Sequence, residues 1–195
     1  LIERQIPLLD NTKVSVESLR EAFLLEWKVE PTHFFDFDLD EEKSFGWQPY
    51  HNTINEGKDS WRLNTEAEKA YALTFDFKEQ IVGFPYFSIK APEGTIVELL
   101  VHESHAVDGT HRLLNTHFNS WSRFICKEGW NTFQTFDFES VKWLQLHIRN
   151  TKGIIVLERI GVLRRTYPFV ALPKIITSDE KYNTVLEACT NTILN

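Results

Sequence analysis

The sequence predicts an all-β protein, an antiparallel β-sandwich of jelly-roll type with a short N-terminal extension and a C-terminal linker helix. Three observations support this prediction. Apolar and polar residues alternate with a period of two, as at Leu73, Phe75 and Phe77, the pattern of a strand with one buried face. Short segments of this kind recur about seven times along the chain. Turn signals separate them, such as Pro92-Glu93-Gly94, where proline presets its own φ and glycine accepts a positive φ.

The N-terminal part of the chain is predicted to be an extension. Residues 15–25 are expected to form a short helix, and Phe35, Phe37 and Leu39 alternate as in a strand. The chain therefore divides into an N-terminal extension at 1–60, a β-sandwich at 61–170, and a linker with a helix at 171–195.

The sandwich strands follow Leu73–Phe77 in order. Those predicted are 83–91, 95–103, 121–127, 132–138, 141–149 and 154–164. In 95–103, the residues Thr95, Val97, Leu99 and Val101 lie on one face. Residues 154–164 are largely apolar on both faces, which favours a central or doubly covered strand.

The last predicted element is a helix with an apolar stripe. Thr177 precedes Glu180 by three residues, the spacing of a capping box. The stripe then consists of Tyr182, Val185, Leu186, Cys189 and Ile193. No glycine or proline stop signal follows it. Because the chain also begins at Leu1 and contains no methionine, we expect a piece of a longer protein, in which other polypeptide covers the stripe.

Composition excludes several classes of function. With 21 Lys and Arg against 28 Asp and Glu, the 195-residue chain has a formal charge of -7, so nucleic-acid binding is disfavoured. The longest apolar run, 167–173, is far shorter than the about 20 residues that cross a bilayer, so no integral membrane protein is predicted. Two cysteines cannot form a disulfide framework. Cys126 and Cys189 are both predicted to be buried packing residues, not nucleophiles.

No metal site and no cofactor are predicted. The sequence has no glycine-rich phosphate loop. Residues 36–42 contain alternating carboxylates, but an EF-hand needs glycine and glutamate where this chain has Glu41 and Trp47. We interpret 36–42 instead as a strand whose acidic face is exposed to solvent.

A histidine-rich stretch contains donors that suit zinc, namely His102, Glu103, His105, Asp108, His111 and, further on, His117. Their spacing matches no zinc signature, and His102 and His105 fall on opposite faces if the strand continues. An exposed polar loop is preferred. A metal-dependent jelly-roll enzyme built on this stretch is the weakest of three functional alternatives.

One strand carries candidate carbohydrate-binding residues. Leu144, Leu146 and Ile148 make one side of 141–149 apolar and leave Trp143, Gln145, His147 and Arg149 on the other. An aromatic plane beside amide, imidazole and guanidinium groups is typical of a sugar-binding surface. It is also typical of a contact between domains, which we prefer.

Four segments in order carry a resemblance to a known family. They are 72–103; 122–148, with the WNTFQTF segment that begins at Trp130; 165–169, Arg-Thr-Tyr-Pro-Phe; and 178–194. Together they resemble the β-sandwich that precedes the helical barrel in bacterial α-L-rhamnosidases, with 178–194 similar to the first barrel helix.

The resemblance implies a non-catalytic domain of a larger glycoside hydrolase. Its partner would be the catalytic helical barrel of the same chain, and its setting the periplasm or cell surface of a bacterium. The family resembles inverting glycosidases that act on terminal α-L-rhamnosides through an acid and a base in the barrel. No catalytic residue is therefore expected in this chain. The alternative is a carbohydrate-binding module that binds oligosaccharide independently through an aromatic and polar sheet face.

Overall fold

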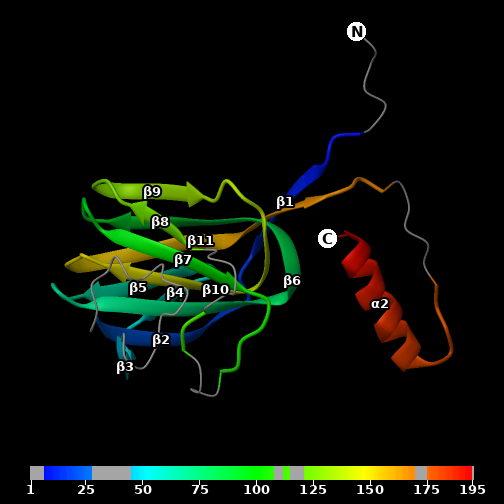
Figure 1. The fold of residues 1–195 in the computed structure, drawn as a ribbon, viewed down its shortest axis with the longest axis horizontal. Helices are drawn as coiled ribbons and strands as arrows, with labels where there is room; N and C mark the ends of the chain where they lie inside the picture. The colour runs from blue at the N-terminus through cyan, green and yellow to red at the C-terminus, as the bar shows by residue number, and fades with distance from the viewer. Residues whose placement is uncertain (1–6, 28–44, 108–111, 115–120, 170–174, 195) are drawn as a thin grey trace, which may run out of the picture.

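Two layers of antiparallel strands pack face to face in this protein (Figure 1). The computed structural model describes residues 7–27, 45–107, 112–114, 121–169 and 175–194. The strands in these residues are β1 (Asp10–Ser15), β2 (Ser18–Trp27), β3 (Phe45–Pro49), β4 (Ile54–Gly57), β5 (Ser60–Thr65), β6 (Ala70–Ala91), β7 (Ile96–His102), β8 (Ser122–Ile125), β9 (Gly129–Gln134), β10 (Glu139–Arg149) and β11 (Gly153–Thr166). The helix is α2 (Glu180–Leu194).

The long strand β6 belongs to both layers. Its first part pairs with β2 and β10, and its last part pairs with β11 and β9. The first layer therefore has the order β3–β2–β6–β10–β7–β8, and the second has the order β4–β5–β11–β6–β9. Figure 1 shows β6 turning from one layer to the other at one end of the sandwich. β1 pairs with the end of β11.

Apolar side chains from both layers fill the space between them. Leu144, Leu146 and Ile148 of β10 are fully buried there. Trp61 of β5 packs edge-on against Phe75 of β6, with ring centroids 4.9 Å apart. Such contacts between layers make the sandwich a single core, and residues alternating with these point outward.

The β-sandwich prediction is confirmed, while the jelly-roll connectivity stays a prediction. Two segments expected to be separate strands, Leu73–Phe77 and 83–91, are the two halves of β6. β7, β8, β10 and β11 lie close to their expected positions, and β11 is central, between β5 and β6. β9 ends at Gln134, so Phe136 and Phe138 lie in the connection to β10 and not in a strand.

The predicted helix at 15–25 is wrong, because these residues contain the strand β2, which pairs with β3 and β6. Ala22 and Leu24 pack on the main core, whereas Phe23 and Leu25 pack on the other side of the sheet. A strand that is apolar on both faces shows no alternation, and its pattern cannot be told from that of a buried helix. Strands of the sandwich therefore also come from 1–60, the predicted N-terminal extension. The strand expected at Phe35, Phe37 and Leu39 lies outside the described residues.

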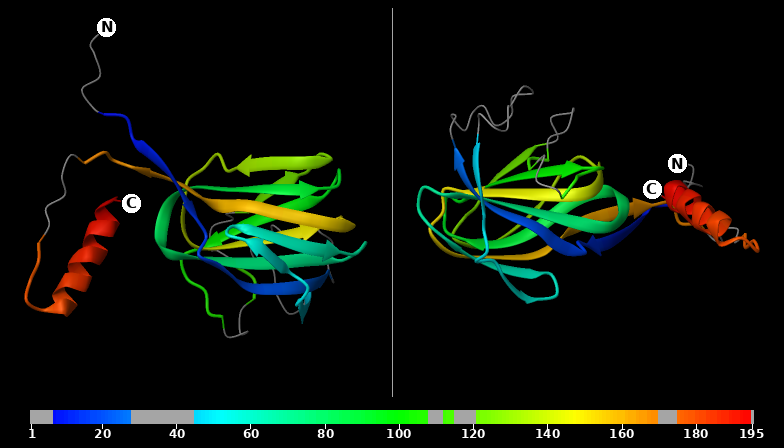
Figure 2. Two further views of the ribbon diagram at one scale, coloured as in Figure 1. Left: turned by 180° about the vertical axis from the view of Figure 1, so that it is seen from behind. Right: turned by 90° about the horizontal axis from the view of Figure 1, so that it is seen from below.

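The helix α2 confirms the last predicted element. The expected cap is corrected, because the Asp179 Oδ1 accepts the hydrogen bond from the backbone N of Lys181 (2.9 Å), whereas Thr177 is tied to Asn183. α2 has no buried residue, and Figure 2 shows it apart from both layers. Among the described residues, no helix combines the length and hydropathy that spanning a membrane requires.

Candidate functional site

The outer side of the first layer is the place where sequence analysis located a sugar-binding surface. Sheet register sets His147 beside Glu98 and Ala72, and sets Gln145 beside Leu100 and Thr74. All four predicted residues, Trp143, Gln145, His147 and Arg149, belong to β10 and alternate with its core residues. We call this outer side, with the chain segment that packs on it, the covered face.

Gln145 lies at the centre of the covered face and is fully buried. Its Nε2 donates to Thr74 Oγ1 and to the backbone oxygen of Arg112, both at 2.7 Å. Its Oε1 accepts from the backbone N of Leu114 at 3.2 Å. One amide therefore joins β10 to β6 and to the segment 112–114.

His147 is also fully buried. Its Nε2 donates to Gln145 Oε1 at 2.8 Å, and its ring meets the indoles of Trp47 and Trp121 edge-on. Burial, with a smaller contribution from the Arg149 charge, lowers the pKa of His147 from 6.5 to about 3. The imidazole is therefore neutral and structural near neutral pH.

Glu98 on β7 holds the guanidinium groups of two neighbouring strands. This carboxylate is fully buried and accepts from Arg149 Nη2 at 2.7 Å and from Arg123 Nε at 2.9 Å. The two arginines keep 13% and 30% of their side chains exposed. Arg149 thus belongs to an ion-pair cluster, and its remaining exposure is small.

Trp143 packs beside a buried histidine. The His105 ring meets the Trp143 indole edge-on, with centroids 5.2 Å apart. His105 Nε2 also lies 2.7 Å from Glu21 Oε2, and these two side chains are 3% and 7% exposed. This pair ties the chain that leaves β7 to strand β2.

Apolar residues close the covered face. Leu113 and Leu114 are buried together with Leu100, and the indoles of Trp47, Trp121 and Trp143 pack against them. The protein's own chain therefore occupies the surface above Gln145 and His147. Sequence analysis missed this cover, although the adjacent leucines at 113 and 114 within a polar stretch are an apolar signal that could have indicated it.

The four predicted residues therefore do not form one exposed surface. Gln145 and His147 lie together beneath the cover, and Arg149 pairs with Glu98. Trp143 remains half-buried. Sugar binding by these residues stays a prediction, and it requires 112–114 to move.

The described residues of the histidine-rich stretch do not point their side chains toward one shared site. His102 Nδ1 accepts from the backbone N of Ser104 at 2.9 Å, while His105 pairs with Glu21. Asp108, His111 and His117 lie outside the described residues. In the part of the chain that is described, no three His, Cys, Asp or Glu residues gather as metal ligands would. The acidic segment 36–42 also lies outside that part.

The two cysteines differ. Cys126 is buried, as predicted, and burial raises the pKa of its thiol to about 11, so it stays protonated. The prediction for Cys189 is wrong, because this residue is exposed on α2. Its stripe has no described neighbour to bury it.

Comparison with solved structures identifies the fold. The structure is similar to a GH78 family rhamnosidase of Bacillus sp. GL1, with a TM-score of 0.64 and 22% sequence identity over 76% of this chain and 16% of that one. It is also similar to a rhamnosidase from Klebsiella oxytoca with rhamnose bound, with a TM-score of 0.60 and 11% identity over 97% of this chain and 36% of that one. The fold is rhamnosidase-like.

This confirms at the level of fold the resemblance found in the sequence. The chain spans 16% and 36% of the length of the two rhamnosidases, so it corresponds to one part of each. No family model matches the sequence, and no curated protein matches it. A family 11 carbohydrate-binding module of Clostridium thermocellum matches with a TM-score of only 0.38, which is too low to support the binding-module alternative.

Proposed function

We propose that this chain is a non-catalytic β-sandwich of a larger glycoside hydrolase similar to α-L-rhamnosidases, and that it packs against the helical catalytic barrel of its parent. The fold shared with parts of two rhamnosidases supports this proposal. By the same resemblance, the parent hydrolyses terminal α-L-rhamnosides with inversion. A periplasmic or cell-surface location belongs to the same proposal.

The apolar stripe of α2 carries the proposal. Tyr182, Val185 and Ile193 are each more than half exposed, and no residue of the helix is buried. A 15-residue helix gains most of its stability from packing an amphipathic face. An exposed stripe of this kind fits a partner that covers it.

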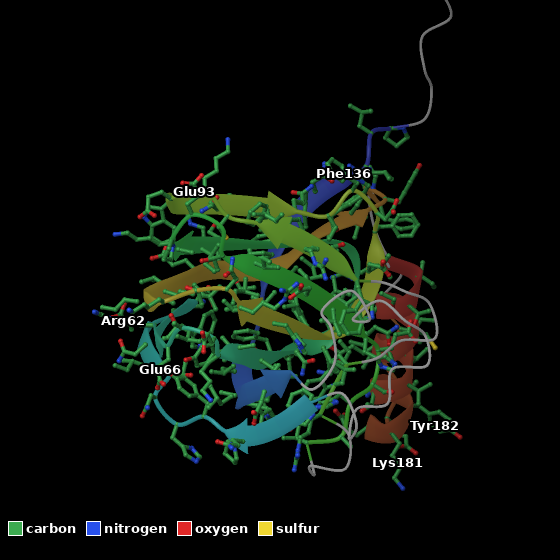
Figure 3. All side chains as sticks on the ribbon, turned by 60° about the vertical axis from the view of Figure 1, so that its left-hand side comes forward. Arg62, Glu66, Glu93, Phe136, Lys181 and Tyr182 are labelled. Carbon is green, nitrogen blue, oxygen red and sulfur yellow. The ribbon has the colours of Figure 1, made fainter. Side chains whose placement is uncertain are left out.

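The end of the sandwich near α2 is also apolar. Phe136 is 99% exposed and Phe138 is 67% exposed, both in the connection between β9 and β10. Figure 3 shows Phe136 at the end of the sandwich from which β1 extends. Tyr167 and Phe169, on the path toward α2, stack edge-on with centroids 4.9 Å apart. These rings supply a second apolar surface for the same partner.

Hydrogen exchange of α2 tests the proposal. The backbone amides of 180–194 should exchange rapidly in the 195-residue chain and slowly in the longer parent polypeptide. In the parent, Val185→Ser on the stripe should restore fast exchange, whereas Glu187→Ser on the polar side should not. Equal protection of α2 in both polypeptides would contradict the proposal.

Sugar binding at the covered face is the alternative function. It predicts that oligosaccharide titrated into this chain binds with an enthalpy that Trp143→Ala removes. Absence of binding by the unmodified chain, or an unchanged enthalpy in the variant, would count against Trp143, Gln145, His147 and Arg149 as a sugar site.

A further inference from the structure

The outer side of the second layer carries a row of side chains that crosses five strands. Register places Trp130 of β9 beside Lys90 of β6, Lys90 beside Val156 of β11, Val156 beside Arg62 of β5, and Arg62 beside Ile54 of β4. Residues adjacent to these in the strands, such as Ile89, Leu157 and Leu63, are buried in the core. The row therefore points outward. We call this outer side the open face, which the left panel of Figure 2 shows from behind the view of Figure 1.

Trp130 is a large and exposed aromatic residue of the open face. Its side chain is 53% exposed, and it lies on β9, whose described sheet partner is β6. The β6–β9 pairing fixes the backbone beneath it on one side. The indole thus offers a supported aromatic surface to solvent.

Hydrogen-bonding groups of both kinds lie in the row of Trp130 and in the next row. In the next row, Thr132, Ser88 and Glu158 lie side by side. Ser88 is only 4% exposed and its Oγ lies 3.1 Å from Thr132 Oγ1, so the exposed Thr132 supplies the accessible hydroxyl of this row. Lys90 is exposed and supplies a cationic donor, while Glu158 supplies an anionic acceptor. The two charges have opposite signs, so this part of the face favours neither a polyanion nor a polycation.

This arrangement matches the surface of a neutral saccharide. The C–H face of a pyranose stacks on an aromatic ring, and its hydroxyls both donate and accept hydrogen bonds. Neighbouring strands are ~4.8 Å apart, about the length of one sugar unit. Apolar side chains (Trp130, Val156, Ile54) alternate across the strands with cationic side chains (Lys90, Arg62). Trp130 supplies the stacking surface and Lys90 a donor, while Arg62 also pairs with Glu56 at 3.1 Å.

We propose that the open face binds a neutral saccharide chain lying across the strands, with one sugar ring stacked on Trp130. This site is distinct from the covered face and uses none of Trp143, Gln145, His147 or Arg149. The proposal is independent of the docking of α2, since no residue of α2 or of the β9–β10 connection takes part.

Native gel electrophoresis of the 195-residue chain in gels that contain a rhamnan, a galactan or a mixed-linkage glucan tests the proposal. At least one polysaccharide should retard the chain, and Trp130→Ala should weaken that affinity by about tenfold or more. Trp130→Phe should recover part of it. Lys90→Ala and Glu158→Gln should each weaken it by a smaller factor.

Phe136→Ala is the matched control, because Phe136 is an exposed aromatic residue outside the open face. In Figure 3 it lies at the end of the sandwich away from Glu93, whereas Trp130 pairs with Lys90, three residues before Glu93. This variant should bind like the unmodified chain. Unchanged melting temperatures would show that all variants fold.

Three results would overturn the proposal. They are no retardation by any of the three polysaccharides, equal retardation of Trp130→Ala, and equal loss in Phe136→Ala. If light scattering instead shows a dimer that Trp130→Ala converts to a monomer, without saccharide binding, the open face joins two copies of this chain and the proposal fails.

Discussion

The two outer faces of the sandwich share the strand β6 but differ in what lies on them. On the covered face, Glu98, Gln145 and His147 are polar and fully inaccessible to solvent. On the open face, Trp130 is apolar and 53% exposed. Alternation along a strand tells which residues leave the core, but it does not tell whether another segment covers them.

The covered face tolerates buried polar groups because they bond to one another. Gln145 links Thr74, His147 and the backbone of 112–114, and Glu98 holds Arg123 and Arg149. Buried polar groups with partners cost little, whereas one left without its partner costs its full desolvation free energy. The two faces should therefore respond very differently to the same substitution.

The largest expected difference concerns two glutamates. Glu98→Ala should lower the free energy of unfolding by about 3–5 kcal/mol, because it leaves two arginines at a largely buried site without their anion. Glu158→Ala on the open face should change it by less than about 0.5 kcal/mol. Urea unfolding of both variants measures the contrast. Equal losses would mean that the faces do not differ in burial as described.

A smaller difference is expected for two glutamines. Gln145→Ala should destabilise the fold by about 2–3 kcal/mol, because Thr74, Leu114 and the Arg112 carbonyl lose their partner. Gln134→Ala, on exposed β9, should have almost no effect. Thermal unfolding compares the two. If Gln145→Ala were as stable as its control, the amide would not hold 112–114 to the sheet.

The pH dependence of stability should report on His147. The pKa of the His147 imidazole is 6.5 in the unfolded chain and about 3 in the folded protein. Between these values the unfolded state binds more protons, so the free energy of unfolding decreases as the pH falls from 6.5 toward 3.

His147→Gln should remove this contribution, reducing the slope by up to about 1.4 kcal/mol per pH unit. His51→Gln, at an exposed position, should leave the slope closer to that of the unmodified chain. Urea titrations at several pH values across the window provide the measurement. A slope in His147→Gln identical to that of the unmodified chain would show that His147 is not held neutral.

The smallest effect belongs to the open face itself. Thr132→Ala removes a hydroxyl that lies 3.1 Å from that of Ser88. Because Ser88 is 4% exposed and loses one hydrogen-bond partner, the variant should lower the free energy of unfolding by about 0.5–1 kcal/mol. Differential scanning calorimetry of this variant measures the change in stability. A large loss would indicate that the open face is covered in solution.

A period of two does not by itself decide which strands can be predicted. The sequence predicts β11, which is largely apolar on both faces, but not β5, in which buried residues alternate with more exposed ones. Both β7 and β10 lie within a few residues of their predicted bounds, β10 because Leu144, Leu146 and Ile148 alternate with polar or aromatic residues, and β7 because Val97, Leu99 and Val101 share one face. β2 is apolar on both sides and was assigned as a helix. The continuity of β6 through Gly83 was also missed. A Cβ at Gly83 would contact the Leu163 backbone oxygen, so glycine there permits the close approach of β6 and β11 and does not end a strand.

The candidate site was predicted in part. The sequence correctly placed Trp143, Gln145, His147 and Arg149 on one side of β10. The adjacent leucines at 113 and 114 indicate a buried segment, but not that it packs on that side of β10, since this depends on contacts between residues 31 apart, such as Leu114 and Gln145. Trp130 appeared only as part of a resemblance, because its exposure depends on β9 being placed at the side of the second layer.

The sharing of β6 between both layers has a mechanical consequence. Unfolding of either layer requires breaking hydrogen bonds of the same 22-residue strand. One layer therefore cannot unfold while the other stays folded. Chemical and thermal denaturation should therefore proceed as one all-or-none transition for the sandwich, preceded only by fraying of α2.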